Sequence, residues 1–544
     1  MKQFRWYGWG SADRTYSFEE RPRAWQFICS ALNLNGDEKY PPCDFDHIEL
    51  CASRVDLKAL HALAHTETSK YIRVFHGYGK SYRDLIRLRR GEIFNPPDAV
   101  IYPDDEDQVQ QIIRYCAAND YALIPFGGGS SVVGGVEPRD RRIVISLDLK
   151  RMSRVLEMDA LAQVASIEPG IWGPELENYL NARGWTLGHF PQSFEFSTLG
   201  GWIATRSAGF ASTKYGTIET MTLGLRMATP AGMIETQSAQ ENSVGPSLLQ
   251  LLIGSEGALG VITRATMRIR ALSKIANYRA MLFGTFADGV AAVRDIVQSD
   301  LAPATIQLLD EEDTRCFFAF RKQARGLQGL VETTESRMLS TLGKSIEQGA
   351  LLILGFEGDA YTVKVTENHV LAICQDHGAF DLGARIAHAW FRDRFESPYL
   401  RDALMDHGVM MDTFETATTW GNLELGYQKL THALSQAAQE VGARILVLTH
   451  LSQCRREGAT LGVTFLAPIT PHQEINHWEH IQRAAIECSI DHGGAIAPHS
   501  GVGYEYAFWL QQKLGALGYD TLLSLKKRLD PKNIMNPGKL FLPA

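Results

Sequence analysis

Between positions 96 and 272, short runs of hydrophobic residues alternate with segments in which hydrophobic residues recur at helical spacing. The run AVIY (99–102) predicts a buried strand, and the apolar positions from Val109 to Ala117 recur at the spacing of one helix face. A second apolar run, YALIPF (121–126), leads directly into the glycine-rich sequence GGGSS. Strand, helix, strand and glycine loop together predict a βαβ unit, with the loop at the carboxyl end of a strand.

Hydrophobic pattern and glycine content divide the chain into four parts. Residues 1–92 are mixed and aromatic and predict a partly helical region, whereas residues 93–272 hold the short strands, helices and glycine loops. In residues 273–490 longer amphipathic segments alternate with strands such as GALLILGFEG. Residues 491–544 return to glycine and end in a helix followed by LDPKNIMNPGKLFLPA. Residues 93–272 and 273–490 are expected to form two domains, and residues 491–544 to pack back on the first of them.

The composition is that of an ordinary globular protein, and its 544 residues are too many for a single core. The net charge is −8, which gives no electrostatic support to nucleic-acid binding. The eight cysteines are scattered, without the spacing of a zinc site or a disulfide framework. No segment has the apolar pattern of a signal peptide or the length of a membrane span. These features predict a cytoplasmic protein without a metal site or a transmembrane segment.

Three loops of small residues indicate a ligand. GGGSS (127–131) can bring backbone N–H groups together around an anion, although a glycine turn after a strand is often only a turn. Its spacing is neither that of a Walker loop nor that of the dinucleotide-binding fingerprint. HFPQSFEFSTLGGWIATRSAG (189–209) and IGSEGALGVIT (253–263) supply further glycines and hydroxyls. Three such loops predict a large cofactor with phosphate groups, enclosed from several sides.

These loops carry a family resemblance. PDAVIYPDDEDQVQQII with PFGGGSSVVGG resembles the FAD-binding domain of the vanillyl-alcohol-oxidase superfamily of PCMH-type flavoproteins. Within that superfamily, HFPQSFEFSTLGGWIATRSAG, GSEGALGVIT and RWYGWG resemble the alkyldihydroxyacetonephosphate synthase family, and the likeness covers nearly the whole chain. The resemblance implies an α+β fold with a two-subdomain PCMH-type FAD-binding domain and an α+β cap, or substrate, domain built on an antiparallel sheet. A C-terminal segment is expected to return to the flavin.

The same resemblance implies which residues contact FAD. They lie in the three loops and are Pro125, Phe126, Gly127, Gly128, Gly129, Ser130, Ser131, Gln192, Ser193, Phe194, Glu195, Phe196, Ser197, Thr198, Thr205, Arg206, Ser207, Ala208, Glu256, Gly257, Ala258, Leu259, Gly260, Val261 and Ile262. Lys539 in NPGKLF is expected to stabilise charge at N1 and O2 of the flavin, with a solvated terminal lysine as the alternative. Some relatives attach the flavin through His or Cys near the first loop. PFGGGSSVV contains neither, so the FAD is expected to be non-covalent.

The resemblance is weakest at the positions expected to perform catalysis. The synthase pattern has an arginine, a tyrosine and a histidine where this chain has Gln307, Gly462 and Ser500. Glutamine cannot supply the permanent charge of arginine, and glycine cannot take a proton. These three replacements predict that synthase activity is weak or absent.

Three residues are the candidates for catalysis. Arg401 in SPYLRD matches a substrate arginine of the family and could bind a carboxylate or phosphate, with a salt bridge as the alternative. His499 in PHSGVG and His450 are the candidate bases, because imidazole titrates near neutrality. A satisfied structural hydrogen bond is the alternative role for each histidine.

Three functions remain open from the sequence. The leading hypothesis is an FAD-dependent oxidoreductase that oxidises a hydroxyl-bearing small molecule, an alcohol or a hydroxy acid, by hydride transfer to flavin N5. The first alternative is an alkyldihydroxyacetonephosphate synthase-like enzyme of ether-lipid synthesis, which exchanges an acyl for an alkyl chain through an adduct at flavin N5. The second is a flavin-binding protein without turnover. Either enzyme implies a small-molecule or lipid-like substrate, and a homodimer is a possible assembly.

Overall fold

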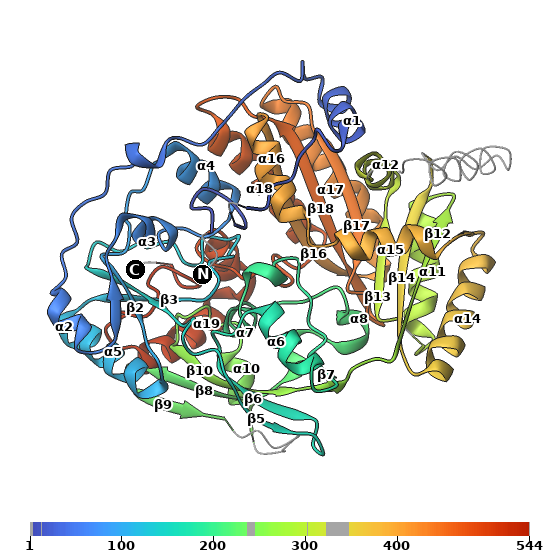
Figure 1. Ribbon diagram of the computed structural model, residues 1–544. Coiled ribbons are helices and arrows are strands. Elements are labelled where there is room, and N and C mark those ends of the chain that lie inside the picture. The colour runs from blue at the N-terminus through green and yellow to red at the C-terminus, as the bar shows by residue number, and fades with distance from the viewer. Residues whose placement is uncertain (1–3, 12, 237–244, 302, 322–347, 543–544) are drawn as a thin grey trace.

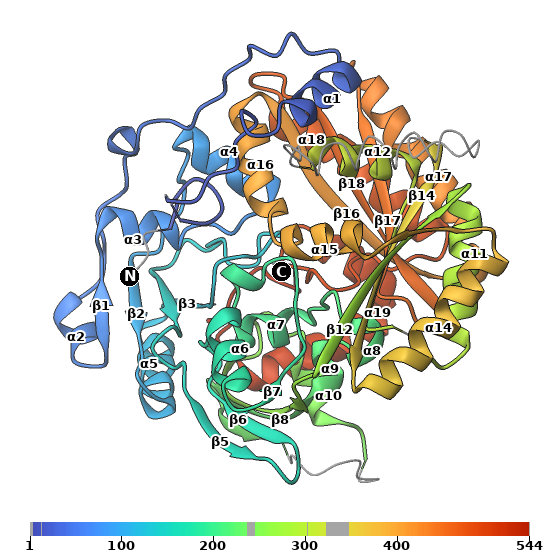
Figure 2. The same ribbon diagram turned by 45° about the vertical axis from the view of Figure 1, so that its right-hand side comes forward.

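The computed structural model describes residues 4–11, 13–236, 245–301, 303–321 and 348–542 of the chain. The fold mixes helices and strands, as the sequence predicts, and Figure 1 shows two bodies packed side by side. One body contains the three small-residue loops and is called here the glycine-loop half. The other is built on a large antiparallel sheet, which Figure 2 shows from a second side.

The first sheet of the glycine-loop half confirms the predicted βαβ unit. Its strand order is β1 (His65–Glu67), β2 (Ala99–Tyr102), β4 (Val144–Asp148) and β3 (Ala122–Phe126), and α5 (Glu106–Asn119) connects β2 to β3. The side chain of Asp105 caps α5 by accepting a hydrogen bond from the amide of Gln108. β2 and β3 are not neighbours, because β4 pairs with both in parallel and occupies the buried centre. GGGSS follows β3 directly, as predicted.

The second sheet of this half is antiparallel. Its strand order is β5 (Val155–Asp159), β6 (Val164–Ile167), β10 (Val261–Arg268), β8 (Thr222–Thr229) and β9 (Gly232–Glu235). The helical segments that accompany it are α6 (Gly173–Asn181), η2 (Phe194–Phe196), α7 (Leu199–Thr205), α8 (Ser212–Tyr215), α9 (Ile218–Met221) and α10 (Leu248–Leu252). The small pair β7 (Trp185–Thr186) and β11 (Arg270–Ala271) lies at its end. One apolar core joins sheet and helices and includes Leu176, Trp202 and Ile203.

The other body contains a seven-stranded sheet in which every pairing is antiparallel, as expected for the cap domain. Its strand order is β15 (Phe380–Gly383), β12 (Ile275–Phe283), β14 (Ala350–Gly358), β13 (Thr305–Leu309), β17 (Leu446–Ser452), β18 (Gly458–Pro468) and β16 (Val409–Thr419). Its helices are α11 (Phe286–Gln298), α12 (Glu311–Phe320), α14 (Ala360–Asp376), α15 (Ala384–Asp393), α16 (Ser397–Asp406), α17 (Trp420–Glu440) and α18 (Glu474–Asp491). Apolar residues of α11, α14, α17 and α18 cover one face of the sheet.

Successive side chains of a strand point to opposite faces of the sheet, so the face that these helices do not cover can make other contacts. Leu451, Leu461 and Phe414 belong to the helix-covered face. Their strand neighbours His450, Gly462 and Glu415 therefore point the opposite way, toward the glycine-loop half.

The N-terminal residues are partly helical, as predicted, but they spread over both bodies. Their helices are α1 (Pro22–Leu32), η1 (Phe45–His47), α2 (Leu57–His61), α3 (Lys70–Phe75) and α4 (Tyr82–Arg90). α1 packs on the seven-stranded body beside Leu448 and Leu466, whereas β1 pairs with β2. The segment before α1 folds back on itself, since Arg5 donates its amide to the carbonyl of Gly10. This N-terminal turn brings Trp9 between the two bodies.

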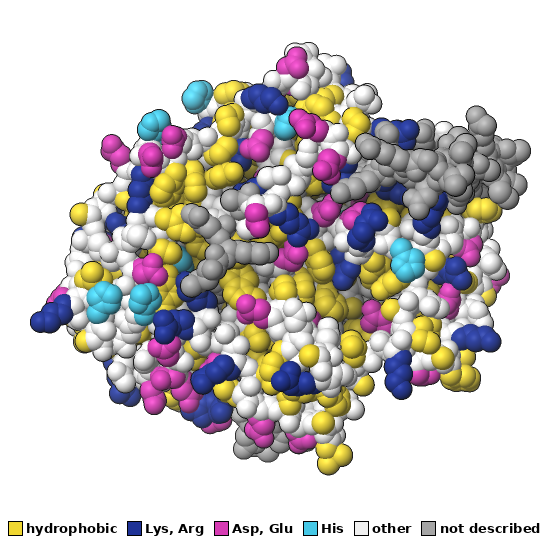
Figure 3. Space-filling view, in the orientation of Figure 1, with side chains coloured by type: hydrophobic (Ala, Val, Ile, Leu, Met, Phe, Trp, Pro, Cys, Tyr) yellow, Lys and Arg dark blue, Asp and Glu magenta, His cyan; other side chains and the backbone are white. Residues whose placement is uncertain are grey.

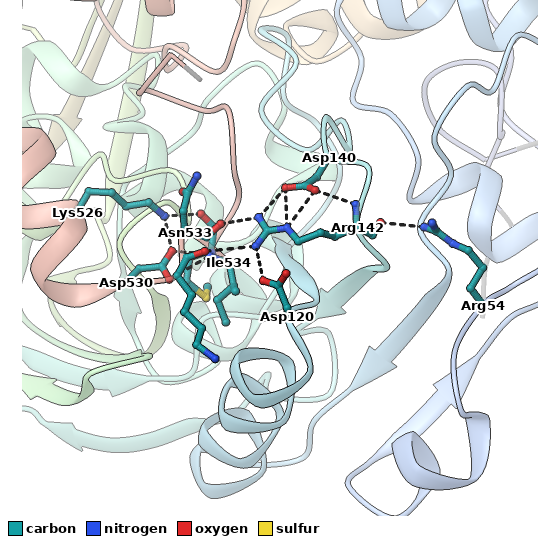
Figure 4. A network of polar contacts seen from close by, with 10 residues as sticks. Arg54, Asp120, Asp140, Arg142, Lys526, Asp530, Asn533 and Ile534 are labelled. Carbon is teal, nitrogen blue, oxygen red and sulfur yellow. Dashed lines mark hydrogen bonds and ion pairs between the residues drawn. The ribbon is translucent and has the colours of Figure 1, made fainter. Parts of the chain in front are cut away.

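The C-terminal segment returns to the glycine-loop half, as expected. After α19 (Ala507–Leu529), the chain forms a parallel bridge between Met535 and Leu123 of β3. Figure 4 shows how Arg142 secures this return: its guanidinium donates to Asp140, to Asp120 and, at 2.7 Å, to the carbonyl of Asn533. Residues 533–535 are thus fixed against the first sheet.

Charged side chains of both signs are mixed on one face of the molecule (Figure 3). On the face seen in Figure 3, basic and acidic side chains are interspersed over both bodies. Among the described helices, none is both long and apolar enough to cross a membrane.

Candidate active site

A cavity lies between the glycine-loop half and the open face of the seven-stranded sheet, and most of the predicted site residues line it. From the predicted set these are Pro125, Phe126, Gly127, Gly128, Gly129, Ser130, Ser131, Gln192, Ser193, Ser197, Thr198, Thr205, Ser207, Ala208, Glu256, Gly257, Gly260, Ile262, Arg401, His450 and His499. Three loops that are distant in sequence therefore meet at one place.

The glycine loop is held against the second loop at very close range. A Cβ atom on Gly128 would lie 1.9 Å from the carbonyl oxygen of Phe196, and one on Gly127 would lie 2.4 Å from Oγ1 of Thr198. Gly129 has a φ of +66°, which favours glycine. The glycines are thus required by the packing of loop on loop, in addition to any approach of a ligand.

The second loop is more regular than its composition suggests. Thr198 caps α7 by accepting a hydrogen bond from the amide of Gly201. Ser197 accepts a hydrogen bond from Nε1 of Trp202 and donates one to the carbonyl of Ser193. Part of the hydroxyl content therefore builds a short helix, although the same residues line the cavity.

Eight residues of the predicted cofactor set have side chains directed elsewhere. In the second loop, Phe194 stacks on Trp202 and Phe395, Glu195 binds Arg14, and Phe196 packs on Trp9 and Tyr399. Arg206 donates to the carbonyl of Gln250, and Ala258, Leu259 and Val261 are buried in apolar cores. Lys539 is also buried, with 1% of its surface exposed, and does not belong to the described lining of the cavity. Their assignment to FAD remains a prediction.

Lys539 is not the solvated lysine that was the alternative to its flavin role. Its ammonium donates to the carbonyl of Glu137 at 2.6 Å, and burial lowers its pKa to about 8. It is therefore no solvated terminal lysine. The closing segment passes through the interior as it returns to β3, which a sequence pattern at a chain end does not reveal.

The cavity wall fits a large polar cofactor such as FAD. Its glycine-loop side consists mainly of small residues, including Gly200, Gly201 and Gly260, which leave backbone exposed to a ligand. Ser255 also lines the cavity, and its buried hydroxyl has no hydrogen-bond partner within the described structure. Such an orphan hydroxyl is costly to leave unpaired, so a ligand group is its natural partner.

Glu256 joins the third loop to the C-terminal segment. Its two carboxyl oxygens accept hydrogen bonds from the amides of Val502 and Gly503, at 2.6 and 2.7 Å. Burial raises the pKa of Glu256 to about 7, although these amides act in the opposite direction. The loop that carries His499 and Ser500 is thereby fixed to the cavity wall.

Arg401 faces the cavity from α16 in a fixed orientation. Its guanidinium donates to Asp412 at 2.9 Å, and Asp412 also accepts a hydrogen bond from Trp478 at 2.7 Å. Arg401 is 8% exposed. The salt bridge weighed from the sequence therefore exists, and it holds the guanidinium at the cavity rather than on the surface.

His499 forms an ion pair with a residue that the sequence analysis did not single out. Its Nε2 lies 3.2 Å from Oε2 of Glu415, whose carboxylate also accepts a hydrogen bond from Ser500. Burial would lower the pKa of His499, but Glu415 outweighs burial and raises it. Burial would likewise raise the pKa of Glu415, and the charge of His499 lowers it overall. The pair favours an imidazolium, which donates a proton or stabilises an anion rather than acting as a base.

His450 and Gln307 lie on neighbouring strands of the same sheet face. His450 is paired with Gly462 across β17 and β18, and its Nδ1 is 3.7 Å from a carboxylate oxygen of Asp313. Gln307 lines the cavity and is 5% exposed. The replacements of the synthase pattern at Gln307, Gly462 and Ser500 thus lie in or beside the site.

Several cavity residues were missed from sequence. Met411, Thr413 and Glu415 occupy alternate positions of β16, and this period of two in MMDTFET was a usable signal for one sheet face. Trp9 also lines the cavity, although RWYGWG gave no indication of where the N-terminus would lie. Its position results from a hydrogen bond of 2.7 Å between its amide and Asp402 of α16.

Comparison with known proteins defines the class first. Residues 97–238 match the family model described as FAD binding domain, and residues 273–540 match the model described as FAD linked oxidases, C-terminal domain. The two matches cover both bodies and the first two of the three loops. The protein is an FAD-dependent enzyme with a PCMH-type fold.

Individual relatives define the family. The chain is 35% identical to the alkyldihydroxyacetonephosphate synthase of Trypanosoma brucei brucei over 87% of this chain and 77% of the relative. It is 32% identical to that of Dictyostelium discoideum over 98% of this chain and 85% of the relative. A solved structure of alkyldihydroxyacetonephosphate synthase superimposes with a TM-score of 0.85 at 29% identity, covering 98% of each chain. The chain belongs to the alkyldihydroxyacetonephosphate synthase family.

Proposed function

We propose that the enzyme exchanges the acyl chain of acyl-dihydroxyacetone phosphate for a long-chain alcohol. The names of its relatives state the product of this exchange, alkyldihydroxyacetone phosphate. The observation that carries the proposal is similarity to three such synthases at 30–35% identity over 86–98% of the chain. The comparisons support this alternative better than the simple oxidation that the replaced residues favoured in the sequence.

The charges and apolar surfaces of the cavity support the same proposal. Arg401 and the imidazolium of His499 offer two positive groups to a phosphate or a leaving carboxylate. Apolar side chains of Pro398, Met411 and Phe210 also line the cavity, where a hydrocarbon chain could pack. FAD, when bound, supplies the redox-active ring beside which the substrate reacts.

Oxidation of an alcohol remains a second candidate because of two replacements. Gln307 lines the cavity where the synthase pattern has an arginine. Gly462 has no side chain that would displace the imidazole of His450. A cavity histidine could accept the hydroxyl proton during hydride transfer. The protonated state favoured for His499 argues against that residue in the same role.

The decisive experiment gives the FAD-loaded enzyme acyl-dihydroxyacetone phosphate and labelled hexadecanol, and measures the labelled ether. We expect turnover at a rate ordinary for enzymes, about 1 per second or faster. Arg401→Lys keeps the charge but not the planar fork, so it should lose most of this rate. No ether product, together with bleaching of the flavin by an alcohol under anaerobic conditions, would establish the oxidoreductase instead.

Two further features belong to this proposal. The FAD is expected to be held without a covalent bond, so acid precipitation should release it intact. The cytoplasmic location and the homodimer expected from the sequence remain predictions.

A further inference from the structure

Gly462 lacks the side chain that would otherwise occupy one position on the cavity face of the sheet, and His450 fills that position. A Cβ atom on Gly462 would lie 2.4 Å from Nε2 of His450, 2.7 Å from Cε1 and 3.1 Å from Cδ2. Contacts below 3.0 Å are essentially never seen for a real Cβ. The imidazole can therefore lie across β18 only because residue 462 is glycine.

One acidic residue, Asp313, lies near the other ring nitrogen of His450. Nδ1 is 3.7 Å from a carboxylate oxygen of Asp313, which is an ion-pair distance rather than a hydrogen bond. Asp310 begins α12 by accepting a hydrogen bond from the amide of Asp313, and it accepts another from the hydroxyl of Tyr427 at 3.2 Å. Nδ1 thus faces the carboxylate of Asp313, while Nε2 stands where the side chain of residue 462 would begin.

We propose that His450, accommodated by Gly462 and oriented by Asp313, is the group that takes the proton of the incoming alcohol. This inference rests on the proposed exchange reaction and names the residue that activates its second substrate. A proton on Nδ1 is favoured by the negative charge of Asp313, which leaves a lone pair on Nε2, the ring atom that lies over Gly462. The side chain lines the cavity, so a substrate hydroxyl can reach it.

The exchange then balances in protons and electrons. The C–O bond between the dihydroxyacetone carbon and the acyl group breaks, and its electron pair leaves with the fatty carboxylate. The alcohol oxygen forms the new ether C–O bond, while its proton passes to Nε2 of His450 and from there to solvent. Neither substrate is oxidised or reduced overall, so no further oxidant is needed.

Other titratable groups face the same region and must enter the interpretation of a pH profile. Asp313 and Asp310 approach from the start of α12, and Glu415 approaches from β16. His499 faces Glu415 from the C-terminal segment, so the carboxylate of Glu415 interacts with His499 as well as with His450. The experiment therefore relies on paired variants rather than on a pH profile alone.

The test is a double-mutant cycle between His450 and Gly462 in the FAD-loaded enzyme. His450→Gln keeps a polar side chain of similar length but cannot carry a proton, so kcat for ether formation should fall by about 10²- to 10⁴-fold. KM for acyl-dihydroxyacetone phosphate and the flavin absorption spectrum should stay unchanged. Gly462→Ala should lower kcat by displacing the ring, yet should do little further harm in a chain that already carries His450→Gln.

Controls separate a proton carrier from a structural histidine. His407→Gln changes a histidine whose Nδ1 bonds the carbonyl of Ala403 and whose ring packs on Phe18 and Trp25, so kcat should not change. Asp313→Asn should lower kcat, and Asp313→Glu should restore part of it, because only the carboxylate orients the ring.

Each outcome has a definite meaning. A wild-type kcat in the His450→Gln variant would overturn the proposal. The proposal would also fail if Gly462→Ala lowered kcat by the same factor in the wild-type chain and in the His450→Gln chain. If the unmodified enzyme forms no ether, the proposed function fails. Failure of the exchange activity is thus distinguishable from failure of the role given to His450.

Discussion

Replacing Glu415 by glutamine tests the charged pair at the centre of the cavity. At 3.2 Å and an effective dielectric constant of 20, two unit charges attract by about 5 kcal/mol. The side chains of His499 and Glu415 are only 14% and 16% exposed, so solvent screens them little. Removing one partner of a buried pair typically costs about 3–5 kcal/mol. The amide of the Glu415→Gln variant would keep an oxygen acceptor for Ser500, which places the expected loss near the lower end of that range, about 3 kcal/mol.

The pH dependence of this loss follows from the directions of the two pKa shifts. His499 has a raised pKa, so its contribution is complete below the unfolded value of about 6.5 and disappears as pH rises through the folded pKa. Glu415 has a lowered pKa, so its contribution is complete above about 4.3 and is lost as pH falls through the folded pKa. The difference in unfolding free energy between wild type and Glu415→Gln should therefore be largest between about pH 4.3 and 6.5.

Two measurements check this prediction. Urea denaturation at several pH values gives the stability difference, and NMR titration of the histidine side chains shows whether the pKa of His499 falls in the variant. Glu440→Gln is the matched control, because Glu440 forms a solvent-exposed pair with His480 at 2.8 Å and its loss should change stability far less. An unchanged titration of His499 in Glu415→Gln would refute the assignment of the imidazolium to this pair.

Two further predictions concern the cofactor. Purified protein should be yellow. The Gly128→Val variant should lose FAD and stability, because its Cβ would lie 1.9 Å from the Phe196 carbonyl oxygen. Gly421→Ala is the control, since a Cβ at that position meets nothing within 4 Å in the described structure. A Gly128→Val protein with full FAD content would show that the two loops can separate without loss. Lys539→Met should leave the flavin spectrum unchanged, since the lysine binds the carbonyl of Glu137. Burial lowers the pKa of Lys539 to about 8, so the free energy of unfolding of the wild type should rise between about pH 8 and 10.4. Denaturation at pH 7 and pH 10 should show this rise in the wild type and not in Lys539→Met. A shifted flavin spectrum would instead place Lys539 at the ring.

The sequence by itself determined the parts of this protein that depend on local pattern. Apolar runs and periodicity located β2, α5 and β3, because burial and backbone hydrogen bonding impose periods of two and 3.6 on nearby residues. The long loop motifs also identified FAD and the family correctly, since phosphate and flavin contacts require small residues at fixed positions.

Only the tertiary structure decided the charge state and the neighbours of the catalytic candidates. Glu415 and His499 are 84 residues apart in sequence, and nothing in either local pattern shows that they form an ion pair. The sequence left open that Lys539 is a solvated terminal residue, whereas the return of the chain to β3 buries it. Gly462 looked like a lost catalytic group, whereas strand pairing shows that its missing side chain makes room for His450. Such contacts arise from long-range packing, in which electrostatic energy depends on distances that sequence spacing does not encode.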